Sequence, residues 1–466
     1  MAKTEDGKKL IILKAENQPS EIFDDFEGER NILCGREFKV SPLNHKNSKS
    51  LRKWFPFTAP VSFGKEGMSM GLGDRLGLAS PGHLRLIKDR GVKPVLAQQS
   101  IRELNLTQRT YEDVLDAASW AVFQEGYEKG FAADGDHLKT EEDIKKALDL
   151  GFTMITLDCS EKIKNEAFNM AKDKIEEEYG KLPQELRKRF EGEYLNKEFS
   201  LGEFTVSFNK KDLQRIALIY VDALIFIKDI YFRVIKPAGR NIDFEVSIDE
   251  TVTPTTPEAH FFVASELMKM QVEVTSLAPK FCGEFQKGID YIGDIDRFGK
   301  EFKLHAAIAD HFGYRLSIHS GSDKFKVFPI IGRYTKGRVH VKTAGTNWLE
   351  TLKVIAMKKP ALFRKMYEFA IENFDEARKY YHVTTDLNRA QKIGDISDEK
   401  LVKVFTHDDA RQILHITYGL ILTSKDENGN YLFRDEIYST LNSFEDEYYN
   451  ALEEHIGKHL KLLGVL

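Results

Sequence analysis

Short apolar segments alternate with longer amphipathic segments along most of this chain. Each apolar segment ends in a polar or glycine-rich turn, which is typical of a strand that leaves a sheet into a loop. The longer segments carry apolar residues at spacings of three and four, which predicts helices; the clearest are 109–130 and 140–151, the second opened by the capping residue Thr140. The expected strands are 68–73, 93–100, 130–137, 153–160, 241–250, 272–280, 314–323 and 338–345.

This alternation predicts the fold class. Strands that alternate with helices pair in parallel through crossover helices, so the chain is of the α/β class. Eight such units favour a (β/α)8 barrel of the TIM type. The alternative is an open doubly wound sheet of six or seven strands, which leaves one or two of the apolar segments as loops.

Three regions fall outside the repeat. Residues 1–55 form an N-terminal extension ahead of a barrel core at 56–346. Residues 161–240 are expected as a helical insertion after the fourth strand, with a charged helix, a hairpin at FSLGEFTVSF and a long helix. This insertion is a cap over the barrel, an oligomer contact or a docking module. Residues 347–466 are expected to be helical throughout and to pack on the barrel.

Composition limits the location and the partners. The chain has 466 residues, 42% hydrophobic and 30% charged, and its net charge of −5 argues against a nucleic-acid binder. Its three cysteines (Cys34, Cys159 and Cys282) have no CxxC spacing, which favours a reducing cytoplasm. The apolar run near the N-terminus is too short for a signal peptide, and the longest apolar window, 216–227, is too short for a membrane span. We expect a cytoplasmic protein with no membrane partner; a homo-oligomer is possible.

The glycine-rich stretch GLGDRLGLASPGH follows the first expected strand. Gly71, Gly73 and Gly77 are spaced GxGxxxG, whereas a dinucleotide loop has GxGxxG, and no GK[ST] follows. The stretch is therefore no phosphate loop of either type. Two interpretations remain open: a tight turn, or a place where the backbone approaches a ligand.

Polar side chains follow all eight expected strands. In a barrel the active site lies at the carboxyl ends of the strands, so these side chains are its candidates. Each alone is more often a helix cap or an ordinary loop residue; their presence at every strand end indicates a site. The candidates for substrate contact are Arg75, Gln98, Asp158, Ser320, Lys324, His340, Lys342 and Thr343.

Three of these strand ends suggest a divalent metal. His137, Glu250 and His319 follow the third, fifth and seventh strands, and imidazoles and carboxylates from separate strands commonly hold Zn²⁺, Mn²⁺, Ni²⁺ or Co²⁺. His260, in the first turn of a helix begun at Thr256, is a fourth candidate. None belongs to a short fixed motif, so an ordinary loop histidine is the alternative for each.

The same strand ends offer an anion site and proton-transfer groups. After the seventh and eighth strands, small-residue turns lead towards helices whose free N–H groups bind anions, and Lys324, His340 and Lys342 add positive charge. Two ordinary capped helices are the alternative. The acid and base candidates are Asp74, Asp134, Asp136, Asp158 and Lys280, and the sequence does not say which two act.

Six segments taken together resemble the tagaturonate epimerase family of bacterial hexuronate catabolism. They are GDRLGLASPGH, ADGDHLKT, FEVSIDETVTPTTPEAHFF, SLAPKF, SIHSGSDKF and HVKTAGTNWLE, and the resemblance covers roughly residues 55–420, including HDDARQILHITYG at 407–419. It implies a metal-dependent enzyme that interconverts D-tagaturonate and D-fructuronate in galacturonate breakdown by inverting one hydroxyl-bearing carbon. It also implies that related members act on ketohexoses such as fructose and tagatose.

The resemblance also implies roles for residues. The ligands would be His137, Glu250 and His319 with His260 as the fourth, the acid and base would come from Asp74, Lys280 and Asp136, and His340 with Lys342 would hold the substrate carboxylate. The inverted carbon is β to the ketone, so its C–H is too weakly acidic for simple enolisation. We therefore expect metal-assisted retro-aldol chemistry rather than transient oxidation, because the sequence carries no nicotinamide fingerprint.

Two other interpretations remain open. A barrel aldolase or sugar isomerase acting on a sugar acid or sugar phosphate would share the metal and anion groups. A non-catalytic carbohydrate-binding protein would bind the same sugars without turning them over.

Overall fold

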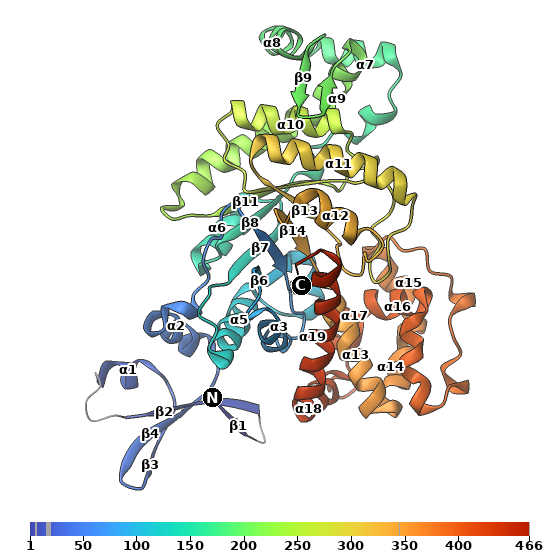
Figure 1. Ribbon diagram of the computed structural model, residues 1–466. Coiled ribbons are helices and arrows are strands. Elements are labelled where there is room, and N and C mark those ends of the chain that lie inside the picture. The colour runs from blue at the N-terminus through green and yellow to red at the C-terminus, as the bar shows by residue number, and fades with distance from the viewer. Residues whose placement is uncertain (5–6, 15–19, 344, 466) are drawn as a thin grey trace.

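Eight parallel strands close into a barrel at the centre of the computed structural model, which describes residues 1–4, 7–14, 20–343 and 345–465 (Figure 1). Strand β14 pairs with β5, with His340 opposite Ser69, and this pairing closes the sheet. The predicted (β/α)8 barrel is therefore confirmed and the open sheet is excluded; the last predicted strand reaches residue 344, which lies outside the described residues. The strands are β5 (Met68–Gly71), β6 (Val92–Ser100), β7 (Ala132–Leu138), β8 (Met154–Asp158), β11 (Asp243–Ile248), β12 (Ser276–Pro279), β13 (Arg315–Ile318) and β14 (Val339–Lys342).

The barrel strands are buried on both faces, which explains their short and strongly apolar runs. In β8, for example, every residue is buried. Leu157 belongs to the main hydrophobic core, whereas its neighbour Thr156 hydrogen-bonds to Asp134 and Glu245 from the adjacent strands. One face of the strand therefore packs in the core, and the other places polar side chains in the barrel interior.

Crossover helices connect the strands, and capping residues set their ends. Helix α5 begins after Thr110, whose side chain accepts from the Asp113 N–H, and ends at Gly126, which has a positive φ of 56°. Thr140 caps α6 in the same way, as the sequence predicts. The crossover helices are α3 (Ser80–Ile87), α5 (Tyr111–Glu125), α6 (Glu141–Leu150), α9 (Lys210–Ile230), α10 (Pro257–Lys269), α11 (Ile295–Phe312) and α12 (Phe328–Thr335), and a short α4 (Ile101–Thr107) precedes α5.

The long connection between β8 and β11 contains the predicted hairpin and the predicted long helix α9. The hairpin is β9 (Glu198–Leu201) with β10 (Phe204–Ser207), and it follows α7 (Lys172–Gly180) and α8 (Gln184–Tyr194). These elements lie against the outer layer of the barrel (Figure 1): Arg189 of α8 donates to both carboxylate oxygens of Glu266 in α10, at 3.0 and 2.6 Å.

The N-terminal part is a small antiparallel sheet in the order β1-β2-β4-β3, with two helices. Its core consists of Leu10, Phe26 and Leu51 with Trp120 of α5, so this part also packs on the barrel helices. The elements are β1 (Ala2–Thr4), β2 (Gly7–Leu13), α1 (Ser20–Asp25), β3 (Glu29–Leu33), β4 (Arg36–Ser41) and α2 (His45–Trp54).

The C-terminal region is a helical group beside the barrel (Figure 1). Its core includes Leu76 and Ala79 from the loop after β5, and α19 returns to the barrel, where Ile456 joins the main core. Between α15 and α16 the described chain forms 3₁₀ helices, the longest at Asp398–Thr406, joined by irregular structure without an α-helix, so the prediction of a region helical throughout is wrong there. Its helices are α13 (Thr346–Lys358), α14 (Pro360–Glu372), α15 (Phe374–Ala377), α16 (Asp408–Ile416), α17 (Tyr418–Thr423), α18 (Arg434–Ser443) and α19 (Glu445–Leu462).

The helices of the described chain give no membrane span: each is too short or too polar to cross a bilayer.

Candidate active site

A polar cavity opens at the carboxyl ends of the barrel strands. Its lining comes from the ends of, or the loops after, every strand except β8, and also from Tyr381 and His415 of the C-terminal region. No described residue of the connection between β8 and β11 lines this cavity. The helical insertion therefore does not form a wall of the cavity. Five predicted substrate and acid–base residues do line it: Arg75, Gln98, Asp136, Ser320 and Lys342.

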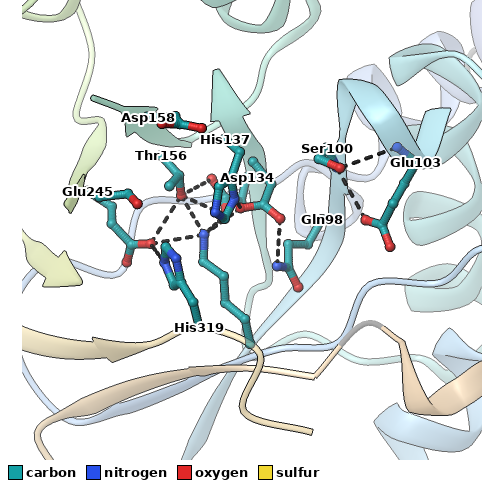
Figure 2. A network of polar contacts seen from close by, with 12 residues as sticks. Gln98, Ser100, Glu103, Asp134, His137, Thr156, Asp158, Glu245 and His319 are labelled. Atoms are coloured by element: carbon teal, nitrogen blue, oxygen red, sulfur yellow. Dashed lines mark hydrogen bonds and ion pairs between the residues drawn. The ribbon is translucent and has the colours of Figure 1, made fainter. Parts of the chain in front are cut away.

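Lys342, at the end of β14, is the centre of a buried polar network. Figure 2 labels three of its partners, Asp134, Thr156 and Glu245. The ammonium group contacts Asp136 Oδ1 at 2.6 Å, Glu245 Oε1 at 2.9 Å and Asp134 Oδ2 at 3.1 Å, and it donates to Thr156 Oγ1 at 2.7 Å. These partners come from β7, β8 and β11, so one side chain joins four strands across the barrel interior.

The network fixes charge where burial alone would remove it. Burial favours the neutral carboxyl, but Lys342 overcomes it and holds the pKa of Asp136 and of Glu245 well below the usual range. For Asp134 burial prevails over Lys342, and its pKa rises to about 6. The pKa of Lys342 itself lies well above its usual value, because the three carboxylates outweigh its own burial.

Two imidazoles and a carboxylate meet beside this network. Possible ligand atoms of His137, Asp249 and His319 all lie within 4.8 Å of one another. His137 has a positive φ of 55°, at an irregularity in the β7–β8 pairing between Gly135 and Leu138. The rings of His137 and His319 lie 4.7 Å apart between centroids.

A buried carboxylate partners each imidazole on one nitrogen. His137 Nδ1 lies 2.7 Å from Asp136 Oδ1, and His319 Nε2 lies 2.8 Å from Glu245 Oε1. Burial lowers the pKa of a histidine, but Asp249 and Glu245 reverse this and raise that of His319 to about 10. Pairs of this kind orient metal-binding histidines, since the partnered nitrogen fixes the ring and leaves the other for an ion.

This cluster fits a divalent cation. His319 Nδ1 is buried, has no hydrogen-bond partner among the described residues and lies 3.2 Å from Asp249 Oδ2. Two imidazoles with one carboxylate suit Zn²⁺, Mn²⁺, Ni²⁺ or Co²⁺. Of the four predicted ligands, only His137 and His319 lie in this cluster: its carboxylate is Asp249, whereas Glu250 lines the cavity outside the cluster and His260 lies elsewhere.

His260 is fully buried in the outer helical layer. Its Nδ1 faces His305 Nδ1 at 2.9 Å, and its Nε2 lies 2.6 Å from the Tyr314 hydroxyl. Burial and the neighbouring His305 hold its pKa well below the usual range. His260 therefore packs inside the protein, away from the cluster.

A second part of the cavity lining, which we call the cationic wall, consists of three cationic side chains and one imidazole: Arg75, Arg102, Lys287 and His415. Arg75 follows β5, Arg102 lies at the start of α4, Lys287 follows β12 and His415 lies in α16.

Most of the remaining predicted residues have structural partners outside the cavity. Asp74 accepts from the backbone N–H groups of Leu76 and Ala79, and Asp158 accepts from that of Ser160. Both carboxylates therefore fix the turn that follows their strand. In Figure 2, Asp158 lies apart from the dashed network.

Two residues predicted to contact the substrate, Lys324 and Thr343, instead have backbone partners. Lys324 is fully buried and donates to the carbonyls of Gln286, Ile289 and Ser322, and Thr343 donates to that of Gly71 at 2.8 Å.

His340 and Lys280 complete the set of predicted residues. His340 lies one layer below Lys342, with Nδ1 2.8 Å from Ser69 Oγ, and burial lowers its pKa to about 3. Lys280 lines an adjoining outer part of the mouth and donates to the Thr251 carbonyl. Neither side chain reaches the cavity that holds the cluster.

Several residues of the site do not lie at the carboxyl ends of strands, where the sequence analysis sought its candidates. Glu245 and Thr156 lie within strands, and Lys287 lies far along the loop after β12. Arg102 directly follows β6, so extending the search by two residues would have found it. His415 carries no such signal, because it belongs to a helix beyond the last strand.

A closed parallel barrel whose polar cavity holds an imidazole–carboxylate cluster and several cationic side chains beyond the strand ends is typical of an enzyme. A family model described as tagaturonate epimerase matches residues 1–463. The tagaturonate/fructuronate epimerase of Thermotoga maritima is 43% identical over 99% of this chain and 93% of its own length. The chain therefore belongs to the tagaturonate epimerase family and is an epimerase.

Solved structures agree with this assignment. The fructuronate-tagaturonate epimerase of Cohnella laeviribosi, in native and glycerol-complexed crystal structures, is 53% identical to this chain with a TM-score of 0.96. The match covers 100% of this chain and 93% of the Cohnella chain.

Proposed function

We propose that this protein interconverts D-tagaturonate and D-fructuronate by inverting one hydroxyl-bearing carbon, with a divalent metal ion as cofactor. The observation that carries the proposal is one cavity lined by both the His137–Asp249–His319 cluster and the cationic wall. A keto-uronate has a carbonyl with adjacent hydroxyls, which a metal ion in the cluster would bind, and a carboxylate, which the cationic wall would bind. The relatives named above support the substrate pair.

The metal ion would be held by His137, Asp249 and His319. When bound, it supplies polarisation of the substrate carbonyl and its neighbouring hydroxyl oxygen. The protein's own contribution there is orientation: Asp136 and Glu245 fix the two rings, and Lys342 keeps both carboxylates ionised.

We infer that Glu250 accepts the proton in a retro-aldol step. Glu250 lines the cavity, directly follows Asp249, and has no hydrogen bond or ion pair within the described part of the chain. As the hydroxyl proton of the carbon to be inverted passes to Glu250, the carbon–carbon bond towards the ketone breaks and leaves its electron pair on the ketone fragment. The aldehyde fragment rotates, the bond re-forms on its other face, and Glu250 returns the proton.

A Glu250→Gln variant tests this role. We expect kcat to fall about 100-fold or more, the usual contribution of a positioned base, while metal content stays at the wild-type level. Turnover by NMR and metal by mass spectrometry provide the two measurements. A rate within about threefold of wild type would assign the proton transfer to another group.

The function itself is tested by incubating the metal-loaded protein with D-tagaturonate in D₂O and following the products by NMR. We expect D-fructuronate without deuterium at the inverted carbon, because that carbon keeps its hydrogen. Three-carbon fragments would indicate an aldolase, aldoses would indicate an isomerase, and binding without turnover would indicate a carbohydrate-binding protein. Deuterium at the inverted carbon would refute the retro-aldol route. D-tagatose and D-fructose, offered separately, test whether neutral ketohexoses are also substrates.

We also infer a cytoplasmic location. Cys34, Cys159 and Cys282 are all free thiols, as is usual in a reducing compartment.

A further inference from the structure

We propose that the cationic wall binds the substrate's carboxylate and thereby makes the enzyme select sugar acids over neutral ketoses of the same carbon skeleton. This inference rests on the proposed function and adds to it the residues that decide the substrate class. Lys342, which the sequence suggested for this task, is already saturated by three carboxylates and a hydroxyl. The recognition of an acid must therefore come from other cations.

Arg75 is held rigidly with part of its hydrogen-bonding capacity unused. Its Nε and Nη2 both donate to Glu103 Oε1, at 3.0 and 2.8 Å, and its guanidinium carbon lies 3.7 Å from the centroid of the Tyr418 ring. Glu103 is itself fixed, because it forms a capping box with Ser100 (Figure 2). Arg75 Nη1 is buried and has no hydrogen-bond partner among the residues described.

Lys287 and His415 are unpaired in the same lining. Lys287 Nζ has no hydrogen bond or ion pair in the part of the chain that the structure describes. Burial lowers its pKa, and Arg102 and Arg75 lower it further against the attraction of Glu103. His415 is 1% exposed, and neither of its ring nitrogens has a hydrogen-bond partner among the described residues.

These unpaired groups point to an anionic ligand. Buried polar groups almost always have partners, so Arg75 Nη1 and both His415 nitrogens require an explanation. Glu103 is the ion-pair partner of Arg75, whereas Arg102 and Lys287 have no ion-pair partner among the described residues, so their repulsion disfavours this clustering unless a further anion binds. A carboxylate answers both points, since it accepts from guanidinium, ammonium and neutral imidazole N–H groups and compensates their charge.

The test compares an acid with its neutral counterpart. For wild type and variants, kcat/KM is measured on D-tagaturonate, and D-tagatose is measured as a competitor through its inhibition constant. The second value does not depend on turnover of the neutral sugar. The main variant is Lys287→Met, because Lys287 has no protein partner whose charge would be left uncompensated.

We expect Lys287→Met to lower kcat/KM for D-tagaturonate by about 10- to 100-fold, mainly through KM, as for a lost hydrogen bond to a charged group. The inhibition constant of D-tagatose should change by less than about threefold. The double variant Arg75→Met with Glu103→Gln removes both members of one ion pair, so no buried carboxylate loses its counter-charge. It should also lower kcat/KM for D-tagaturonate while the inhibition constant of D-tagatose stays nearly unchanged. The matched control is Arg333→Met, which removes an exposed charge from α12.

If Lys287→Met weakened the binding of D-tagatose as much as it lowered kcat/KM for D-tagaturonate, the role of Lys287 would be structural and the proposal would be overturned. An unchanged kcat/KM for D-tagaturonate would overturn it as well. If wild type fails to convert D-tagaturonate at all, the proposed function fails. Calorimetric binding of D-tagaturonate and D-tagatose to the same variants then still decides what the cationic wall recognises.

Discussion

Replacing Lys342 by methionine should destabilise the barrel more than any surface change. The substitution keeps the length of the side chain but removes an ammonium group that contacts Asp134, Asp136 and Glu245 at 2.6–3.1 Å. All three carboxylates are buried, so they lose their counter-charge without gaining water. Breaking a buried ion pair from one side costs about 3–5 kcal/mol of the free energy of unfolding, and we expect a loss of that size at pH 7.5.

The loss should depend on pH through Asp134. Its pKa in the folded protein is about 6, above the value of 3.8 for a free carboxyl, so the folded state binds more protons between these values. Stability from this group is complete at low pH and is lost as the pH rises through about 6. Without Lys342 that pKa rises further, so the falling limb extends to higher pH. The variant should therefore differ least from wild type near pH 5 and most near pH 8.

Urea unfolding followed by circular dichroism at pH 5, 7.5 and 8 measures the free energy of unfolding of the variant and of wild type. Lys211→Met, an exposed change in α9, is the control and should stay within about 0.5 kcal/mol of wild type. If Lys342→Met stayed within about 1 kcal/mol at pH 7.5, or weakened the fold more at pH 5 than at pH 8, the ammonium would not hold these carboxylates together.

Three further variants separate ligand, core and turn residues. His319→Ala should lose activity and bound metal together after dialysis, and full metal occupancy would show that the ligand set is wrong; exposed His311→Ala should keep both. His260→Gln should keep its metal while unfolding at about 1–3 kcal/mol lower free energy, because its buried partners lose hydrogen bonds, and metal loss would restore it as a ligand. Asp74→Asn should cost about 1 kcal/mol through weaker acceptance from Leu76 and Ala79, read out as a lower urea midpoint; a loss of more than 100-fold in kcat without that shift would return it to catalysis.

The barrel could be predicted because its periodicity is encoded locally. Strands buried on both faces are short apolar runs, and helices such as α6 carry their own caps at Thr140 and Gly151. The same local logic failed between α15 and α16, where apolar residues pack without regular helix. There the tertiary contacts, rather than the spacing along the chain, set the backbone.

The site was predictable as a location more than as a set of atoms. His137 and His319 lie in the cluster, but its carboxylate is Asp249 rather than Glu250, because β11 ends at Ile248 and not at 250. His340 and Lys342 are two residues apart and both lie in the barrel interior, yet only the second reaches the mouth. How far a residue lies below the mouth of the barrel depends on the stagger between neighbouring strands of the closed sheet. This stagger cannot be predicted from a single sequence.

His415 and Tyr381 give the C-terminal helices a part in the order of events during synthesis. All eight strands have left the ribosome once Lys342 has emerged, but the groups that complete the cavity follow much later in the chain. A nascent barrel at that point lacks the part of the cavity lining that Tyr381, and His415 of α16, supply. The lining of the cavity is therefore completed only after all eight barrel strands have been made.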